Sequence, residues 1–191
     1  MPLNKVCIGF VIITLFGHVW GCSGIRVSQD YDLSRDFSSL STYAWQTESQ
    51  PETGDIRVDN SLLDARFRSA INDSLSKRGY QKGEQENADF YVAYTYQIDS
   101  KIESSNVTVG FGLGGGSGGA FTGIGVDSGG RVREYDEGLL VIDLIDTSNA
   151  DLLWRGTGTT PIIQHAKPEK TVKNINEWVE KILAQFPPQP K

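Results

Sequence analysis

Cysteine and histidine are scarce in this sequence, with two of each among 191 residues. Cys7 lies in an apolar run near the start, so the chain beyond residue 21 contains only Cys22 and can form no internal disulfide. His165 is the single histidine of that part. Because there is no cysteine pair and no histidine cluster, the composition argues against a zinc site, and we expect no metal or other cofactor.

The sequence also lacks an apolar run of about 20 residues, the length that a membrane-spanning helix requires. The apolar run from Val6 to Phe16 has eleven residues and lies between Lys5 and His18. A short positively charged start followed by such a run is typical of a secretory signal. We therefore expect residues 1–21 to be a signal peptide and residues 22–191 to form one mature domain.

The stretch Val19-Trp20-Gly21-Cys22 resembles the lipobox of bacterial lipoproteins, in which an aliphatic residue and two small residues precede a cysteine that receives diacylglycerol. Trp20 is larger than the residue usual at its position. The resemblance implies that acyl chains such as palmitate attach Cys22 to a membrane, and several chains together give lasting attachment. Ser23, where inner-membrane retention typically has Asp, favours the outer membrane with the domain in the periplasm. Ordinary signal cleavage near the same place is the alternative.

Basic residues are fewer than acidic ones. Removing residues 1–21 leaves 17 Lys and Arg against 24 Asp and Glu, a net charge of −7. Proteins that bind nucleic acids need clustered Lys and Arg to neutralise phosphates. We therefore expect no nucleic-acid partner.

Glycine, by contrast, is abundant in one segment: eleven of the residues from Gly110 to Gly130 are glycine. Gly110, Gly112 and Gly115 satisfy the G-x-G-x-x-G pattern, but no amphipathic helix and no G-K-[ST] follows, so we do not expect a phosphate-binding loop. We interpret residues 107–131 as a glycine-rich β-excursion. It is either a mobile hairpin tip or an exposed ribbon that pairs with an envelope protein or with copies of the chain.

Two segments have apolar residues at helical spacing. The first follows a capping signature at Ser61 and Asp64 and ends near Gly79. Its apolar positions are Leu63, Phe67, Ala70, Ile71 and Leu75. The second begins after Pro168 and stops at Pro187. Its apolar positions are Val172, Ile175, Val179, Ile182, Leu183 and Phe186.

Alternating apolar and polar residues predict strands near residues 25–31, 42–45, 89–99, 107–113, 131–146 and from 152 onward. The turn residues 147–150 predict a hairpin between the last two. This order predicts a single α+β domain with a mostly antiparallel sheet, two amphipathic helices on one face and the glycine-rich excursion.

Several separated segments together resemble the bacterial lipoprotein family called domain of unknown function 4136. The matching segments are Asp30-Tyr31-Asp32, Thr42-Tyr43-Ala44-Trp45, Gly79-Tyr80, Ala88-Asp89-Phe90, Ile142-Asp143-Leu144, Leu153-Trp154-Arg155-Gly156 and Phe186-Pro187-Pro188. The resemblance covers about residues 25–188. It implies an envelope lipoprotein with one α+β domain and supplies no catalytic residue.

Functional candidates are few. We expect a non-enzymatic structural or interaction module with Cys22 as the lipidation site. Trp45, Tyr94 and Trp154 are candidates for a small-molecule or glycan site, although aromatic residues in strands also form cores. A hydrolase would require His165 to reach a serine and a carboxylate. The carboxylates at Asp30, Asp32, Asp36, Asp143, Asp146 and Asp151 favour turn and ion-pair roles over calcium binding.

Overall fold

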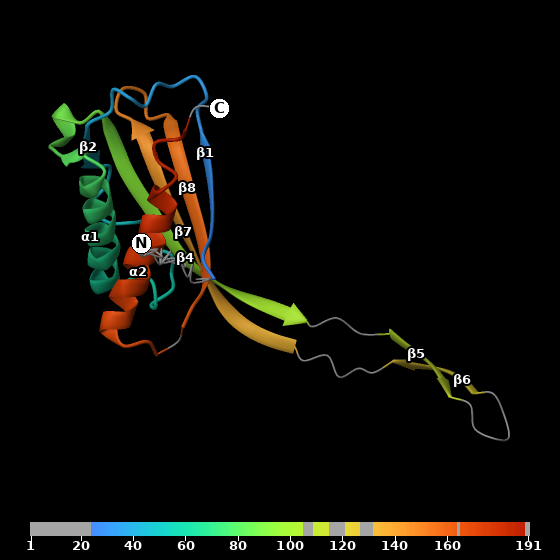
Figure 1. Cartoon of the computed structure of the whole chain (residues 1–191). Helices are drawn as coiled ribbons and strands as arrows, with labels where there is room; N and C mark the ends of the chain where they lie inside the picture. Colours follow the sequence, from blue (N-terminus) through green and yellow to red (C-terminus); the bar gives the residue numbers. More distant parts are fainter. Residues whose placement is uncertain (1–23, 105–108, 115–120, 127–131, 164, 190–191) are drawn as a thin grey trace, which may run out of the picture.

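The computed structural model describes residues 24–104, 109–114, 121–126, 132–163 and 165–189. It contains a six-stranded mixed sheet and two α-helices, which confirms the expected single α+β domain. Figure 1 shows α1 (Ser61–Lys77) and α2 (Pro168–Leu183) side by side along the sheet. The strands of the sheet are β1 (Arg26–Tyr31), β2 (Thr42–Trp45), β3 (Gln81–Lys82), β4 (Phe90–Ser104), β7 (Val132–Asp146) and β8 (Leu152–Pro161).

The strands lie in the order β1-β8-β7-β4-β2-β3. Within this order, β1, β8, β7 and β4 are each antiparallel to the next, as expected. The hairpin of β7 and β8 turns at residues 147–151. At the other edge β2 runs parallel to both β3 and β4. The parallel pairing arises because α1 separates β2 from these partners along the chain and acts as a crossover.

Side chains from both helices and the sheet form one core. Ile71 of α1 and Val179 of α2 are fully buried, in the same cluster as Phe90 and Val92 of β4. One position differs from the helical pattern: Val172 is 40% exposed. It lies in the first two turns of α2, before Ile175, the first buried residue of that helix.

The cap of α1 also differs from the expectation. The N-cap is Asn60 and not Ser61, because the Asn60 side chain accepts a hydrogen bond from the Leu63 amide at 2.8 Å. Asn is as good an N-cap residue as Ser. Asp64, expected to complete a capping box, instead pairs with Arg68 at 3.1 Å and accepts a hydrogen bond from Tyr94.

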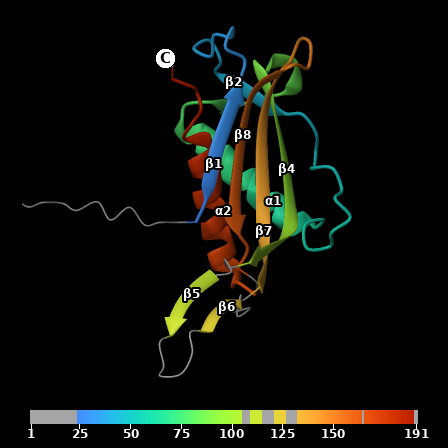
Figure 2. The same cartoon turned by 90° about the vertical axis from the view of Figure 1, so that its right-hand side faces the viewer.

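The hairpin of β4 and β7 is longer than its neighbours. β8 ends at Pro161, opposite Glu137, whereas β4 and β7 remain paired as far as Ser104 and Val132. β5 (Val109–Gly114) and β6 (Phe121–Val126) form a separate antiparallel pair. Figures 1 and 2 show this extension leaving one end of the domain.

Candidate functional site

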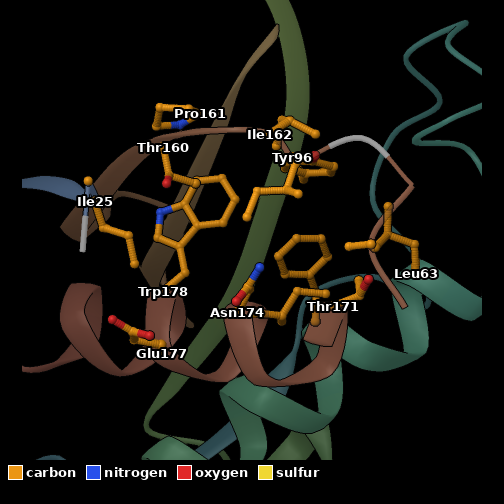
Figure 3. A pocket seen from close by; sticks show the side chains of 15 residues that line it. Ile25, Leu63, Tyr96, Thr160, Pro161, Ile162, Thr171, Asn174, Glu177 and Trp178 are labelled. Atoms are coloured by element: carbon orange, nitrogen blue, oxygen red, sulfur yellow. The ribbon is translucent and has the colours of Figure 1, made fainter. Parts of the chain in front are cut away.

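A cavity of about 280 Å³ lies between α2 and the end of the sheet where β1 begins and β8 ends. Figure 3 shows its side chains converging from the segment before β1, from β4 and β8, and from both helices. Its apolar lining includes Ile25, Leu63, Phe67, Tyr96, Ile175 and Trp178. Its polar lining consists of Thr160, Thr171, Asn174 and Glu177.

Three aromatic rings form one wall of the cavity. The ring centroids of Phe67 and Tyr96 are 4.9 Å apart, and Trp178 meets Tyr96 edge on at 5.8 Å. Burial raises the pKa of Tyr96 to about 12, so its phenol is protonated at neutral pH and cannot serve there as a base. The wall therefore offers apolar contact and no base at neutral pH.

Glycines in the sheet allow α2 to lie close enough to form this wall. A Cβ atom at Gly138 would lie 2.7 Å from Cδ1 of Ile162 and 2.9 Å from Cη2 of Trp178. A Cβ atom at Gly158 would lie 2.8 Å from Cδ1 of Ile182 and would also overlap Nε1 of Trp178. These glycines therefore leave space for the large side chains of α2.

The indole N–H of Trp178 is buried and has no hydrogen-bond partner among the described residues. A buried donor of this kind costs about 1–3 kcal/mol. The rest of the Trp178 ring makes apolar and aromatic contacts. The stabilisation from these contacts outweighs the cost of the unpaired N–H group.

A second cavity of about 470 Å³ adjoins the first and shares Leu63, Tyr96 and Ile162 with it. Arg57 and Asp136 line its polar side and form an ion pair of 2.9 Å. Asp55 also binds Arg57, at 2.7 Å. The Arg57 guanidinium is therefore paired with the carboxylates of Asp55 and Asp136, and it has little capacity left to bind an anionic ligand.

His165 lies on the connection before α2, with a positive φ of 57°, and lines this second cavity. No serine is among the described residues that line it. The described part of the chain also has no group of three or more His, Cys, Asp or Glu that could hold a metal ion.

Of the aromatic candidates, Trp154 is fully buried and its Nε1 donates to Gln29 at 2.9 Å. Tyr94 is 4% exposed and donates a hydrogen bond to Asp64 at 2.6 Å. Burial and the adjacent Asp64 carboxylate raise the pKa of Tyr94. Both side chains are thus core residues with satisfied polar atoms.

Trp45 is half-buried and meets the Tyr94 ring at 6.2 Å, so the structure brings these two candidates together and leaves Trp154 apart. The Arg68 guanidinium lies 4.3 Å from the centre of the Trp45 ring, and Trp45 Nε1 donates to Asn72. Trp45 lines a mostly polar depression of about 380 Å³ on the surface.

The acidic candidates serve turns and ion pairs. Asp32 and Asp36 accept hydrogen bonds from the amides of Ser34 and Ser38. These hydrogen bonds hold the pKa of both carboxyls below the usual range. Asp143 pairs with Arg155 at 2.7 Å. Cys22 lies outside the described residues.

Sequence reasoning missed the cavity itself. Its residues come from four elements and two connecting segments, and Gly24, Tyr96 and Trp178 are far apart in the sequence. Trp178 was also absent from the expected apolar face of α2, although it follows Ile175 by three residues. That spacing was the available signal.

The fold is that of an α+β domain with an apolar cavity at one end of its sheet. Over residues 27–188 the chain matches the family described as Domain of unknown function (DUF4136), and it belongs to that family. No protein with a curated description matches it. Neither helix of the described residues is long and apolar enough to cross a membrane.

Solved structures that match this chain include the following two. A PDZ domain protein from Parabacteroides distasonis is 13% identical, with a TM-score of 0.53 over 87% of this chain. The chain spans 37% of that protein's length. The PelC dodecamer from Paraburkholderia phytofirmans is 14% identical, with a TM-score of 0.43 over 87% of this chain and 99% of that one.

Proposed function

We propose that this protein is a lipid-anchored envelope protein whose domain is an interaction module and not an enzyme. The observation that carries the proposal is that the N-terminal segment and the long hairpin leave the sheet at the same end. β1 begins with Arg26 opposite Thr159, next to the end of β8, and β4 and β7 continue past that end. An ion pair between Arg26 and Glu137 joins the two exits.

The lengths of the two exits support a role at a membrane. Cys22 precedes Arg26 by four positions, so an anchor at Cys22 holds this end of the sheet within about 14 Å of its lipid. The paired extension from Asp99 to Ser104 alone reaches about 17 Å, and β5 and β6 lie farther along it. A domain tethered so closely presents the extension along the membrane surface, where envelope partners are found.

The register of β5 and β6 supports a contact role for the glycine-rich ribbon, defined as residues 109–126. Phe111 is opposite Ile124, and Val109 is opposite Val126. Glycines are likewise opposite glycines at Gly110 and Gly112. At four of the six pairs, therefore, the register matches an apolar residue with an apolar residue or a glycine with a glycine. Such a ribbon suits pairing with another strand, on an envelope protein or on a copy of this chain.

Membrane fractionation of Cys22→Ala tests the anchor. We expect the protein to move from the outer-membrane fraction to the soluble periplasmic fraction, since no acyl chain remains to hold it. Cys7→Ala, which changes the other cysteine, is the matched control and should stay with the membrane. Mass spectrometry that found an unacylated N-terminus on the wild-type protein would refute the proposal.

A periplasmic small-molecule binding module is the second candidate function. The cavity next to Trp178 favours it, because apolar cavities with a few polar groups are typical ligand sites. The two functions are compatible if the ligand is the anchor itself.

A further inference from the structure

We infer that the 280 Å³ cavity holds an acyl chain carried by the protein's own Cys22. The inference rests on the proposed lipid anchor. The domain would then exist in two states, one with the chain in the membrane and one with it folded back under α2.

Position is the first argument. Gly24 lines the cavity, and a Cβ atom there would lie 3.7 Å from Pro161, which lines it too. Cys22 precedes Gly24 by two residues, a span of at most about 7 Å. A chain attached to the Cys22 sulfur therefore begins within reach of the cavity, and no domain movement is needed to bring them together.

The lining is the second argument. Phe67, Ile175 and Trp178 are buried at 1%, 5% and 4% exposure and contribute rings and aliphatic carbons. An alkyl chain gains free energy from each methylene that such surroundings remove from water. The volume lies near the lower end of the range for ligand pockets, about 300 Å³, which suits one chain and excludes a whole diacylglycerol.

Charge distinguishes a tethered chain from a free fatty acid. Among the described residues that line the cavity there is no Lys or Arg, and its one charged residue, Glu177, is already paired with Lys181 at 3.9 Å. A free carboxylate would therefore find no cationic partner in the lining. A chain joined through a neutral ester, amide or thioether carries no such charge. Thr160, Thr171 and Asn174 in the lining can donate hydrogen bonds to the oxygens of an ester or amide linkage.

The test uses the chain from residue 22 onward, in which Cys22 is the sole cysteine, and labels it with N-ethylmaleimide or N-dodecylmaleimide. We expect the dodecyl label to raise the thermal midpoint by about 4 °C or more over the ethyl label, because an occupied cavity stabilises the folded state. A terminal bromine on the dodecyl chain should quench about a third of the tryptophan fluorescence, since Trp178 is one of three tryptophans after residue 21. Trp178→Phe should abolish that quenching.

Two variants of α2 test whether the rise in thermal midpoint originates in the cavity. Asn174→Phe adds bulk at the cavity lining and should abolish the dodecyl shift, whereas Lys173→Phe adds the same bulk at an exposed neighbour and should leave it. Equal midpoints for the two labels would overturn the inference. A shift that disappears on dilution would do so too, because a neighbouring copy would then supply the chain.

The label is attached chemically, so this result does not depend on whether cells acylate Cys22. Failure of the proposed anchor would appear in the fractionation of Cys22→Ala, and failure of the cavity inference would appear in the labelled domain. The two hypotheses can therefore fail separately.

Discussion

At the scale of single residues, Gly158 is one of the positions where the sheet leaves no space for a side chain. Gly158→Ala would force a methyl group against Ile182 and Trp178, and overpacking of a core costs about 1–3 kcal/mol. We expect the free energy of unfolding, measured by denaturant titration, to fall by about 1–3 kcal/mol or more.

Gly83→Ala is the matched control for that substitution. A Cβ atom at Gly83 meets nothing within 4 Å, and its φ is not positive. We expect it to be neutral or slightly stabilising. Equal stability losses in the two variants would show that space beneath α2 is not what requires Gly158.

Asp89 fixes the entry to β2. Its carboxylate accepts hydrogen bonds from the amides of Ser41 and Thr42 at 2.9 and 2.8 Å and from both hydroxyls. The two amides, followed by the hydroxyls, lower the pKa of Asp89 from 3.8 to about 2.

Because this folded-state pKa lies below the unfolded value, Asp89 stabilises the fold above pH about 4 and loses that effect as the pH falls toward 2. Asp89→Asn should therefore reduce stability at neutral pH and flatten its acid dependence between pH 4 and 2. Thermal midpoints across this range measure the effect. An unchanged slope would mean that Asp89 is not responsible for it.

At the scale of elements, Arg78 joins the ends of the two helices. Its Nε donates to the carbonyl of Leu183 at 3.0 Å, its Nη1 to Ser74 at 2.7 Å, and its Nη2 pairs with Glu180 at 2.8 Å. Lysine cannot make these three contacts, because its single ammonium group lacks the planar fork.

We therefore expect Arg78→Lys to lower the free energy of unfolding by about 1–3 kcal/mol, since the buried Ser74 hydroxyl and the Leu183 carbonyl lose a partner. Arg66→Lys, on the same helix, is the control and should change stability little. If both substitutions behaved alike, the contacts of Arg78 would contribute nothing specific.

The elements themselves were largely predictable. Helical spacing located α1 and α2, and alternation located β1, β2, β4, β7 and β8. Periodicity does not encode strand pairing, so the parallel contacts of β2 and the short β3 were missed. The Asn60 cap was missed because Ser61 and Asp64 fit the capping pattern equally well, and only the local backbone decides between them.

At the scale of the whole molecule, the cavity was beyond prediction from the sequence. It exists because Gly138 and Gly158 let α2 approach the sheet while Ile25 and Ile162 close its ends. These residues become neighbours only when the sheet order is known. The residues that sequence reasoning did select, Tyr94 and Trp154, are buried aromatics whose patterns look alike for cores and for binding surfaces.

The ribbon gives the last prediction, because β5 and β6 form their own two-stranded sheet apart from the six-stranded one. Replacing residues 114–119 with an Asn-Gly turn should leave the thermal midpoint of the domain unchanged, since the core is formed elsewhere and the cost of loop closure changes slowly with length. Membrane attachment through Cys22 should also persist.

The shortened protein should lose its contact with an envelope partner or with a second copy of the chain. Crosslinking in intact cells should capture an envelope partner, or a second copy of the chain, with the wild-type ribbon and much less of it with the shortened one. Calorimetric titration with ATP and with NAD should show no binding to either protein. The glycines are followed directly neither by a helix nor by the G-K-[ST] lysine that a phosphate-binding loop requires. Saturable nucleotide binding that disappears on shortening would instead make the ribbon a phosphate site. Unchanged crosslinking would show that the ribbon recognises neither a partner nor a copy of the chain.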